Sequence, residues 1–597
     1  MFFQRQVFKN HNKKVSENMW KYIKKYLPYA VLAAMFMVGE VLMDLLQPEI
    51  LSEIVDNGVL GINNNGVGDL GIVWKNGIIM IVLVLFGGLC GAMNNVFVQM
   101  TGQNIGNDMR KDCFRSIMAF SFSQIDRFGT GSLITRITND ITQVQNLVSQ
   151  FVRGMVRTSM LMFGSIYFMF RLNFRFGLVV LCAFPCIVCC IIVCLHKASP
   201  LFSKLQNQLD KVNSIMQEDI SGIRIIKACV KEIHEKIRFG KANDELIKTQ
   251  LRVLIIFAFM NPIMNAMMYV VVLLILVIGS FEVSSGAVSP GTIMAGITYT
   301  TQLLNGIMML VMLFQNISCG AVSWKRIKEI LNSQPQLKNG SFSGVTKSKG
   351  KIEFRNVSFS YEGSNHVILK NIDLTITPGE TVAIMGATGS GKSSLVNLIP
   401  RFYDISKGSV LVDGVDVREY DQTVLREKIA FVLQKSELFS RSIQENISWG
   451  DSCAELPSIQ KAASIAQADD FILSTANGYD TLVAERGMSL SGGQKQRISI
   501  ARAILKKAEI LIFDDSTSAL DLKTEANLYN ALRESAPHAT KIIIAQRIAS
   551  VRQADRIVVL EDGQIVSVGS HAELIAGCKT YRDIYDSQMG EESDING

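Results

Sequence analysis

The sequence predicts an α-helical membrane bundle of six spans fused to a soluble α/β domain. Hydrophobic residues make up 48% of the 597-residue chain. They are concentrated in roughly the first 330 residues, where they form long apolar runs. The remainder alternates short apolar runs with charged, helix-like stretches, which is the pattern of an α/β domain. The chain therefore divides into a membrane half and a soluble half.

The six predicted spans are segments that stay apolar for roughly 20 residues or more, the length that crosses a bilayer core about 30 Å thick. They lie near residues 28–50, 76–100, 150–170, 176–196, 254–281 and 292–318. An even number of spans returns the chain to its starting side. The expected divisions are an N-terminal arm with an interfacial helix, a membrane domain, a linker and a nucleotide-binding domain, over residues 1–27, 28–331, 332–350 and 351–597.

Charge places the N-terminus and the soluble half in the cytoplasm. The N-terminal arm is rich in cations: Arg5, Lys9, Lys13, Lys14, Lys21, Lys24 and Lys25. The predicted outer loops 56–71 and 282–290 contain no Lys or Arg, as the positive-inside rule expects. The turn between the third and fourth spans departs from the rule, because it carries Arg171 and Arg175.

An amphipathic helix is expected just before the first span. Apolar residues recur there at helical spacing, namely Met19, Trp20, Ile23, Tyr26 and Leu27. Lys21, Lys24 and Lys25 stand between them, so the segment suits the inner membrane interface. A basic start to the first span is the alternative.

The soluble half carries a glycine-rich motif after the apolar run Thr381–Met385. Its sequence is Gly386-Ala-Thr388-Gly389-Ser390-Gly391-Lys392-Ser393-Ser394. An apolar strand, a glycine-rich loop and a helix in this order define a P-loop. Backbone N–H groups of such a loop bind phosphate, Lys392 reaches the β and γ phosphates, and Ser393 holds Mg²⁺. ATP and Mg²⁺ are therefore the predicted cofactors.

A second candidate phosphate site lies about 100 residues further on. The run Leu490-Ser491-Gly492-Gly493-Gln494 opens a helix whose N-terminal N–H groups can bind phosphate. The apolar run Ile510–Phe513 then ends in Asp514, as expected of a buried strand that delivers a carboxylate to Mg²⁺. Two phosphate cradles in one domain imply a nucleotide held between two domains.

With these motifs the chain resembles the ATP-binding cassette (ABC) transporter family, from the interfacial helix to about residue 585. The resemblance implies that Tyr361 stacks on adenine, that Gln434 belongs to the glutamine loop, and that Asp521 closes the D-loop. The implied ATP-binding residues are Tyr361, Gly386, Thr388, Gly389, Ser390, Gly391, Lys392, Ser393, Ser394, Gln434 and Asp514. The implied Mg²⁺ ligands are Ser393, Gln434 and Asp514, and the residues facing the partner's ATP are Ser491, Gly492, Gly493 and Gln494.

The membrane half resembles the exporters of that family. The segments 128–140 and 217–227 are similar to exporter intracellular loops, whose short coupling helices dock onto nucleotide domains. Glu485-Arg486-Gly487 is similar to a motif that exporters carry before the signature loop. The resemblance implies a half-transporter with long cytoplasmic helix extensions, in which two chains make one exporter.

Two positions depart from the family pattern at the catalytic centre. Asp515 stands where matching members have a Glu that deprotonates water, and Gln546 stands where they have a His that contacts the γ phosphate. General-base assistance is worth about 10² to 10⁴ in rate and depends on reach, so a shorter carboxylate loses much of it. A Gln amide cannot carry a proton. We expect a degenerate site in a heterodimeric bacterial exporter, whose partner supplies Glu and His at the site that Ser491 and Gly493 complete.

Alternatives to this expectation stay open at this point. Asp515 and Gln546 could be tolerated drift in a slow homodimeric exporter, or the chain could be an importer of metal chelates on the same fold. A soluble chromosome or repair ATPase also has a P-loop and a signature loop, but six spans argue against it. Glu40 and Asp44 would favour cationic substrates, and Arg153 and Arg157 anionic ones. The sequence does not choose between drugs, peptides and lipids.

Overall fold

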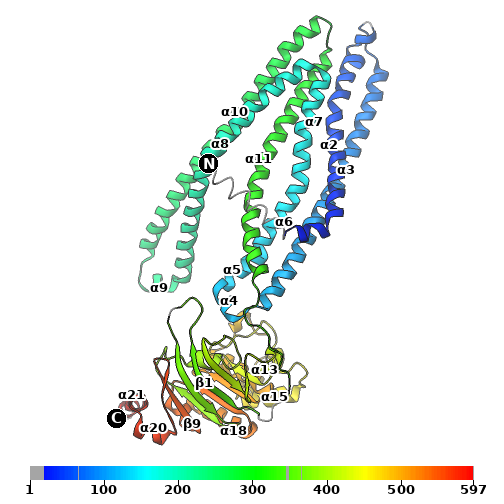
Figure 1. Cartoon of the computed structure of the whole chain (residues 1–597). Helices are drawn as coiled ribbons and strands as arrows, with labels where there is room; N and C mark the ends of the chain where they lie inside the picture. The colour runs from blue at the N-terminus through cyan, green and yellow to red at the C-terminus, as the bar shows by residue number, and fades with distance from the viewer. Residues whose placement is uncertain (1–18, 65, 345–348, 365, 596–597) are drawn as a thin grey trace. The chain divides into compact units, whose positions relative to one another are not determined.

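The computed structural model describes residues 19–64, 66–344, 349–364 and 366–595. The chain forms two compact units, Met1–Arg115 with Gly131–Asn332 and Ser116–Thr130 with Ser333–Gly597. Figure 1 shows the helices of the first unit and the mixed sheets and helices of the second. The start of the N-terminal arm, with four of its cations, lies outside the described residues. Residues 19–25 are helical, where an interfacial helix is expected.

Long helices build the first unit. Within the described residues, those of 17 residues or more are α2 (Leu27–Glu53), α3 (Leu70–Met118), α7 (Val156–Leu172), α8 (Phe174–Ser221), α10 (Glu232–Ser284) and α11 (Pro290–Asn332). Among the described helical stretches, four are long and apolar enough to cross a membrane: Leu27–Val59, Leu70–Met118, Phe174–Ser221 and Glu232–Ser284. Each predicted span lies within one of the six helices, except that the third starts before α7. It begins at the end of α6 (Ile141–Gln150) and runs through a π-helical turn.

Five of the long helices of the first unit, α2, α7, α8, α10 and α11, pack around one apolar core. Phe176 of α8 and Tyr299 of α11 are fully buried in it. The Tyr299 hydroxyl donates to the carbonyl of Leu45 in α2 at 2.7 Å, which satisfies its polar atom. α8 and α10 run side by side beyond this core and are joined at their ends by α9 (Ile223–Ala228) (Figure 1). A smaller cluster with Val212 and Leu246 holds the two helices together there.

The arginines that depart from the positive-inside pattern are both paired. α7 and α8 are joined by Asn173 alone, whose side chain accepts the N–H of Arg175 and caps α8. Arg171 lies 3.4 Å from a carboxylate oxygen of Glu49. Arg175 lies 3.0 Å from Glu282, whose side chain is largely buried. Each positive charge in this turn is thus matched by a carboxylate from another helix.

The described residues of the second unit form two sheets, one with the strand order β2-β1-β4-β5 and one with the order β10-β9-β3-β8-β7-β6. The strands are β1 (Ile352–Phe359), β2 (Leu369–Ile376), β3 (Thr381–Met385), β4 (Lys407–Val412), β5 (Val415–Asp416), β6 (Ile429–Val432), β7 (Ile510–Asp514), β8 (Thr540–Ile544), β9 (Arg556–Glu561) and β10 (Gln564–Gly569). β3, β7 and β8 are parallel and buried along nearly their whole length, as continuous apolar runs in a parallel sheet should be.

Helices cover this sheet and follow its strands. They are α12 (Lys392–Asn397), α13 (Gln422–Glu427), α14 (Ile443–Ser448), α15 (Leu456–Ile465), α16 (Asp469–Leu473), α17 (Gly492–Leu505), α18 (Leu522–Ser535), α19 (Ile548–Val551), α20 (His571–Gly577) and α21 (Lys579–Ile595). Because β3, β8 and β7 are adjacent and parallel, the segments that follow them meet at one edge of the sheet.

A short helix from the first third of the chain belongs to the second unit. α4 (Phe122–Phe128) starts with a capping box between Ser121 and Gln124. The Phe122 ring lies 4.6 Å from the Phe402 ring, centroid to centroid, and the Tyr403 hydroxyl donates to Asp126 at 2.9 Å. The docked helix therefore ends where the exporter-like segment 128–140 begins.

The start of the predicted linker lies on the second unit. The Gly340 N–H donates to the carbonyl of Tyr420 at 3.0 Å, and the Phe342 N–H donates to the carbonyl of Glu419 at 2.9 Å. The Phe342 ring packs edge-on against the buried Tyr420 ring, at 5.1 Å. Backbone hydrogen bonds, which form an isolated parallel bridge between Phe342 and Tyr420, and ring packing thus hold this segment on the second unit.

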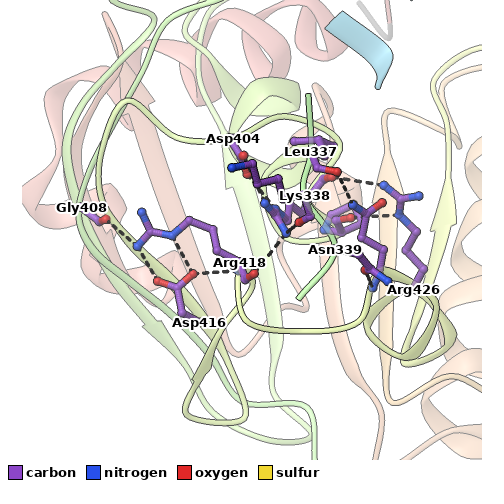
Figure 2. A network of polar contacts seen from close by, with 11 residues as sticks. Leu337, Lys338, Asn339, Asp404, Gly408, Asp416, Arg418 and Arg426 are labelled. Atoms are coloured by element: carbon purple, nitrogen blue, oxygen red, sulfur yellow. Dashed lines mark hydrogen bonds and ion pairs between the residues drawn. The ribbon is translucent and has the colours of Figure 1, made fainter. Parts of the chain in front are cut away.

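The buried side chain of Arg401 fixes the same segment from inside. It is 3% exposed, and its Nη1 donates to the carbonyls of Lys338 at 2.9 Å and Arg418 at 3.3 Å. Its Nε and Nη2 form a fork on Asp404, at 2.7 and 3.2 Å. Figure 2 shows Lys338, Asp404 and Arg418 in this network. One guanidinium therefore joins the linker, a loop and the segment after β5.

Replacing this guanidinium should destabilise the second unit. Arg401→Met leaves the carbonyl of Lys338 and the Asp404 carboxylate without their partner, so we expect a loss of about 2 kcal/mol. The thermal unfolding transition of the purified chain measures it. Arg418→Met is the control, because the Arg418 side chain is exposed, unlike that of Arg401, and so we expect a smaller loss of about 1 kcal/mol. Equal losses from both substitutions would contradict the role given to burial.

Candidate nucleotide-binding site

The P-loop lies between β3 and α12, as the sequence predicts. Gly386 has φ +148°, and a Cβ there would lie 2.0 Å from the carbonyl oxygen of Leu560. Gly391 has φ +98°, and a Cβ there would lie 2.8 Å from the Leu369 side chain. Both positions require glycine, on conformational and on steric grounds. The loop can therefore keep its N–H groups open for a phosphate.

Lys392 bends back over the loop. Its Nζ donates to the carbonyls of Gly386 at 2.9 Å and Ala387 at 2.8 Å. Burial lowers the pKa of this ammonium, and the nearby Asp515 and Asp514 carboxylates oppose that shift. The Lys392 ammonium is partly buried and bonded to neutral carbonyl oxygens. It can exchange these carbonyls for charged phosphate oxygens, which are stronger acceptors.

Ser393 and Asp514 form the oxygen pair expected of a Mg²⁺ site. The Ser393 hydroxyl donates to Oδ1 of Asp514 at 2.7 Å, and Asp514 is 5% exposed. Burial raises the pKa of the Asp514 carboxyl, the hydrogen bond from Ser393 lowers it, and the charge of Asp515 raises it. A divalent cation would compensate this buried negative charge, and Mg²⁺ prefers such oxygen ligands. These residues therefore fit Mg²⁺ bound together with a nucleotide.

Asp515 is held by two amide side chains. Its Oδ2 accepts a hydrogen bond from Gln546 Nε2 at 2.8 Å and another from Gln434 Nε2 at 3.2 Å. The residue is 8% exposed and has φ +47°, an unusual value for a non-glycine residue. Nε2 of Gln434 faces Asp515, so the amide oxygen of Gln434 is the atom that could reach Mg²⁺.

A cavity of about 340 Å³ gathers most of the predicted site residues. Its lining includes Tyr361, Thr388, Gly389, Gly391, Lys392, Ser393, Ser394, Gln434, Asp515 and Gln546. The Tyr361 hydroxyl lies 3.0 Å from Ser394 Oγ, and its ring meets that of Tyr403 edge-on. The lining also contains Ile368 and Ile544, which sequence analysis did not single out. Gly386, Ser390 and Asp514, in the loop and the strand, are not among the residues that line it.

The signature residues lie outside this cavity. Ser491 caps α17 through a capping box with Gln494, and Ser491 and Gly492 are exposed. A Cβ at Gly493 would lie 2.9 Å from the carbonyl oxygen of Ala519, which ties the signature to the D-loop. Asp521 caps α18 by accepting the N–H and the hydroxyl of Thr524, and these bonds lower the pKa of its carboxyl. The signature is thus free for a nucleotide held elsewhere.

One arginine of the membrane unit pairs with two carboxylates from a distant part of the sequence. Arg157 of α7 forms a hydrogen-bonded ion pair with Glu40 of α2 and a second pair, at 3.3 Å, with Asp44. The two carboxylates therefore share one guanidinium as their partner. Arg153, one turn before Arg157, has a buried Nε with no hydrogen-bond partner among the described residues.

A helical membrane unit joined to a P-loop domain with a separate signature loop defines an ABC transporter. Residues 30–308 match the family of ABC transporter transmembrane regions, and residues 369–518 match the ABC transporter family. The chain belongs to the ABC transporter family.

Relatives and a solved structure agree. The chain is 39% identical to an uncharacterised ABC transporter ATP-binding protein of Bacillus subtilis, over 96% of this chain and 98% of the relative. It is 34% identical to an ATP-dependent lipid A-core flippase of Syntrophus aciditrophicus, over 86% and 85%. A bacterial Atm1-family ABC exporter with ATP bound is similar in structure, with a TM-score of 0.78 at 25% identity, over 95% of this chain and 98% of the exporter.

These findings confirm the predicted fold class, a transmembrane helical domain fused to an α/β nucleotide-binding domain. The protein is a multi-pass ABC exporter half-transporter, a class that hydrolyses ATP and acts as a dimer in contact with lipid and substrate. Two of these similar proteins are named as a flippase and an exporter, so the importer alternative is not favoured.

The Mg²⁺ pair gives a test that separates metal binding from nucleotide binding. Asp514→Asn removes the buried charge that a dication would compensate, so affinity for a fluorescent ATP analogue with Mg²⁺ should fall about tenfold. Affinity in the presence of EDTA should stay the same or rise, because a negative charge near the phosphates is lost. An equal loss with and without Mg²⁺ would show that Asp514 does not act through the metal.

Proposed function

We propose that this chain is the degenerate-site subunit of a heterodimeric ABC exporter in a bacterial cytoplasmic membrane. Its own P-loop site binds ATP with Mg²⁺ and retains it, with slow hydrolysis. Its signature loop, Ser491 to Gln494, completes the hydrolytic site of a partner half-transporter that carries Glu and His. The N-terminus and the nucleotide-binding domain face the cytoplasm.

The pairing of Asp515 carries the proposal. A general base must reach the attacking water and have a lone pair free to accept its proton. Here the Asp515 carboxylate is one methylene shorter than Glu, and Oδ2 accepts from both Gln546 and Gln434. These two amide donors hold Oδ2 in place, so the shortened carboxylate cannot reach further toward a bound water without breaking a hydrogen bond. Gln546 itself has no titratable proton.

The signature loop supports the other half of the proposal. Its residues keep the family pattern, its helix N-terminus is exposed, and none of them lines the cavity at this chain's own P-loop. Helix N-terminal N–H groups favour an anion such as the γ phosphate. The two departures from the family pattern, Asp515 and Gln546, therefore affect only one of the two ATP sites to which this chain contributes.

For substrates, we propose amphipathic or apolar compounds such as drugs, peptides or lipids. Arg157 pairs with both Glu40 and Asp44, and together with Arg153, one turn away, the two arginines balance the two carboxylates in formal charge. A membrane surface without a strong net charge favours apolar contact over recognition of a single ionic group. The relatives named as lipid A-core flippases support a lipid-like substrate.

Restoring both catalytic positions should restore hydrolysis. The double variant Asp515→Glu with Gln546→His should raise the ATP turnover of the purified chain about 100-fold, since it supplies a base of full reach and a titratable contact. Phosphate release measures it. Adding Lys392→Ala should abolish the gain, which ties it to this chain's own P-loop. The proposal is wrong if the wild-type chain alone already turns over ATP at the restored rate, as a competent homodimer would.

In the pair formed with its partner, the signature loop should matter more than the P-loop. We expect Gly492→Glu to lower the ATP turnover of the reconstituted pair by about tenfold or more. The new carboxylate would lie against the phosphates of the ATP bound at the partner's P-loop. Gly577→Glu, at an exposed glycine with open space around it, is the matched control. Lys392→Ala should leave more turnover than Gly492→Glu does. The reverse order would assign the hydrolytic site to this chain.

A further inference from the structure

The C-terminal helix contacts the segment that carries Gln546. Gln588 of α21 accepts the N–H of Ile548 through Oε1 at 2.8 Å and donates from Nε2 to the carbonyl of Gln546 at 2.7 Å. Gln588 lies 40 positions after Ile548 and 42 positions after Gln546 in the sequence. One side-chain amide thus takes both polar backbone groups that flank Arg547.

This geometry replaces a missing neighbouring strand. Arg547 is extended, with φ −93° and ψ 132°, and lies just after the end of β8. In an extended chain the carbonyl of one residue and the N–H two residues later point to the same side, where a parallel strand would bind both. A primary amide offers the same acceptor and donor. Gln588 therefore fixes the extended backbone that follows β8, where none of the described strands does so.

Two side-chain contacts of the nucleotide site come from the segment 546–548 that Gln588 binds. On one side, Gln546 donates to the Asp515 carboxylate at 2.8 Å. On the other, the Arg547 guanidinium donates to the carbonyls of Leu520 at 2.9 Å and Ser518 at 3.2 Å, both in the D-loop. A shift of this peptide would move both side chains together.

α21 is built to hold Gln588 in place. Tyr581, Ile584, Tyr585 and Gln588 recur at positions i, i+3, i+4 and i+7, so they share one face of the helix. Tyr581 is fully buried, in the same apolar core as Ile548, and its hydroxyl lies 2.7 Å from Nδ1 of His571. Ile584 and Tyr585 pack against that core. The helix is thus anchored one turn before Gln588.

We propose that Gln588 is a positioning residue for the nucleotide site. It fixes the backbone on both sides of Arg547, which keeps Gln546 on Asp515 and Arg547 on the D-loop. It touches neither the nucleotide cavity nor its lining side chains directly. The C-terminal helix is therefore a part of the site's geometry, and ATP retention depends on it. This inference rests on the proposed retaining role of the site.

A mutant cycle on the full-length purified chain tests it. The measured quantity is the release rate of radiolabelled ATP with Mg²⁺ after a chase with unlabelled ATP. Gln588→Ala should speed release about threefold to tenfold, the size of one or two lost hydrogen bonds. Gln588→Glu keeps the side-chain bulk but loses the donor, so it should also speed release. Ser587→Ala, an exposed neighbour on the same helix, should leave release unchanged.

The cycle separates positioning from general destabilisation. If Gln588 acts through Gln546 and Arg547, adding Gln588→Ala to the double variant Gln546→Ala with Arg547→Ala should change release by less than about twofold, because both contacts it orients are already gone. The inference is overturned if Gln588→Ala or Gln588→Glu releases ATP like the wild type, or if the effect of Gln588→Ala multiplies with that of the double variant. These outcomes concern ratios between variants. The proposed function fails on a different result, a high absolute turnover of the wild-type chain.

Discussion

The parallel order of β3, β8 and β7 is the constraint on which the nucleotide site depends. Each strand delivers a different chemical group at its carboxyl end: the P-loop after β3, Gln546 after β8, and Asp514 with Asp515 at the end of β7. The backbone register places these groups within hydrogen-bond distance of one another, Ser393 with Asp514 and Gln546 with Asp515. The strands can hold this register because they are almost fully buried apolar runs.

Within that frame the groups that would bind phosphate and Mg²⁺ are all present, whereas the two positions next to them depart from the family pattern. The glycines, Lys392 and the Ser393–Asp514 pair follow from steric and electrostatic needs of phosphate and Mg²⁺, and they are all present. Asp515 and Gln546 instead hydrogen-bond to each other. An amide donor matched to a short carboxylate makes a stable resting contact. A Glu and a titratable His in the same places would be poised for proton transfer.

Much of this was predictable from the sequence, because local patterns carry it. The P-loop, the apolar strand before Asp514 and the capping box at Ser491 are each contained in fewer than ten consecutive residues. The sequence did not show contacts between distant segments, such as Arg157 with Glu40, Arg175 with Glu282, and Gln588 with Gln546. Ile368 and Ile544 were missed for a different reason, since an apolar residue in a strand has no signal that separates cavity lining from core.

The placement of α4 changes what counts as the soluble domain. By chain order, Phe122 to Phe128 belong to the membrane half, yet they are part of the second compact unit and cover Phe402 and Tyr403 with an aromatic side chain and a carboxylate. A fragment cut at Ser333 would therefore lack a piece of its own surface, and both rings would lose their cover. The solubility and folding of such a fragment would be those of a unit that lacks residues 116–130. Dissection of this protein into domains by sequence position alone would separate residues that fold together.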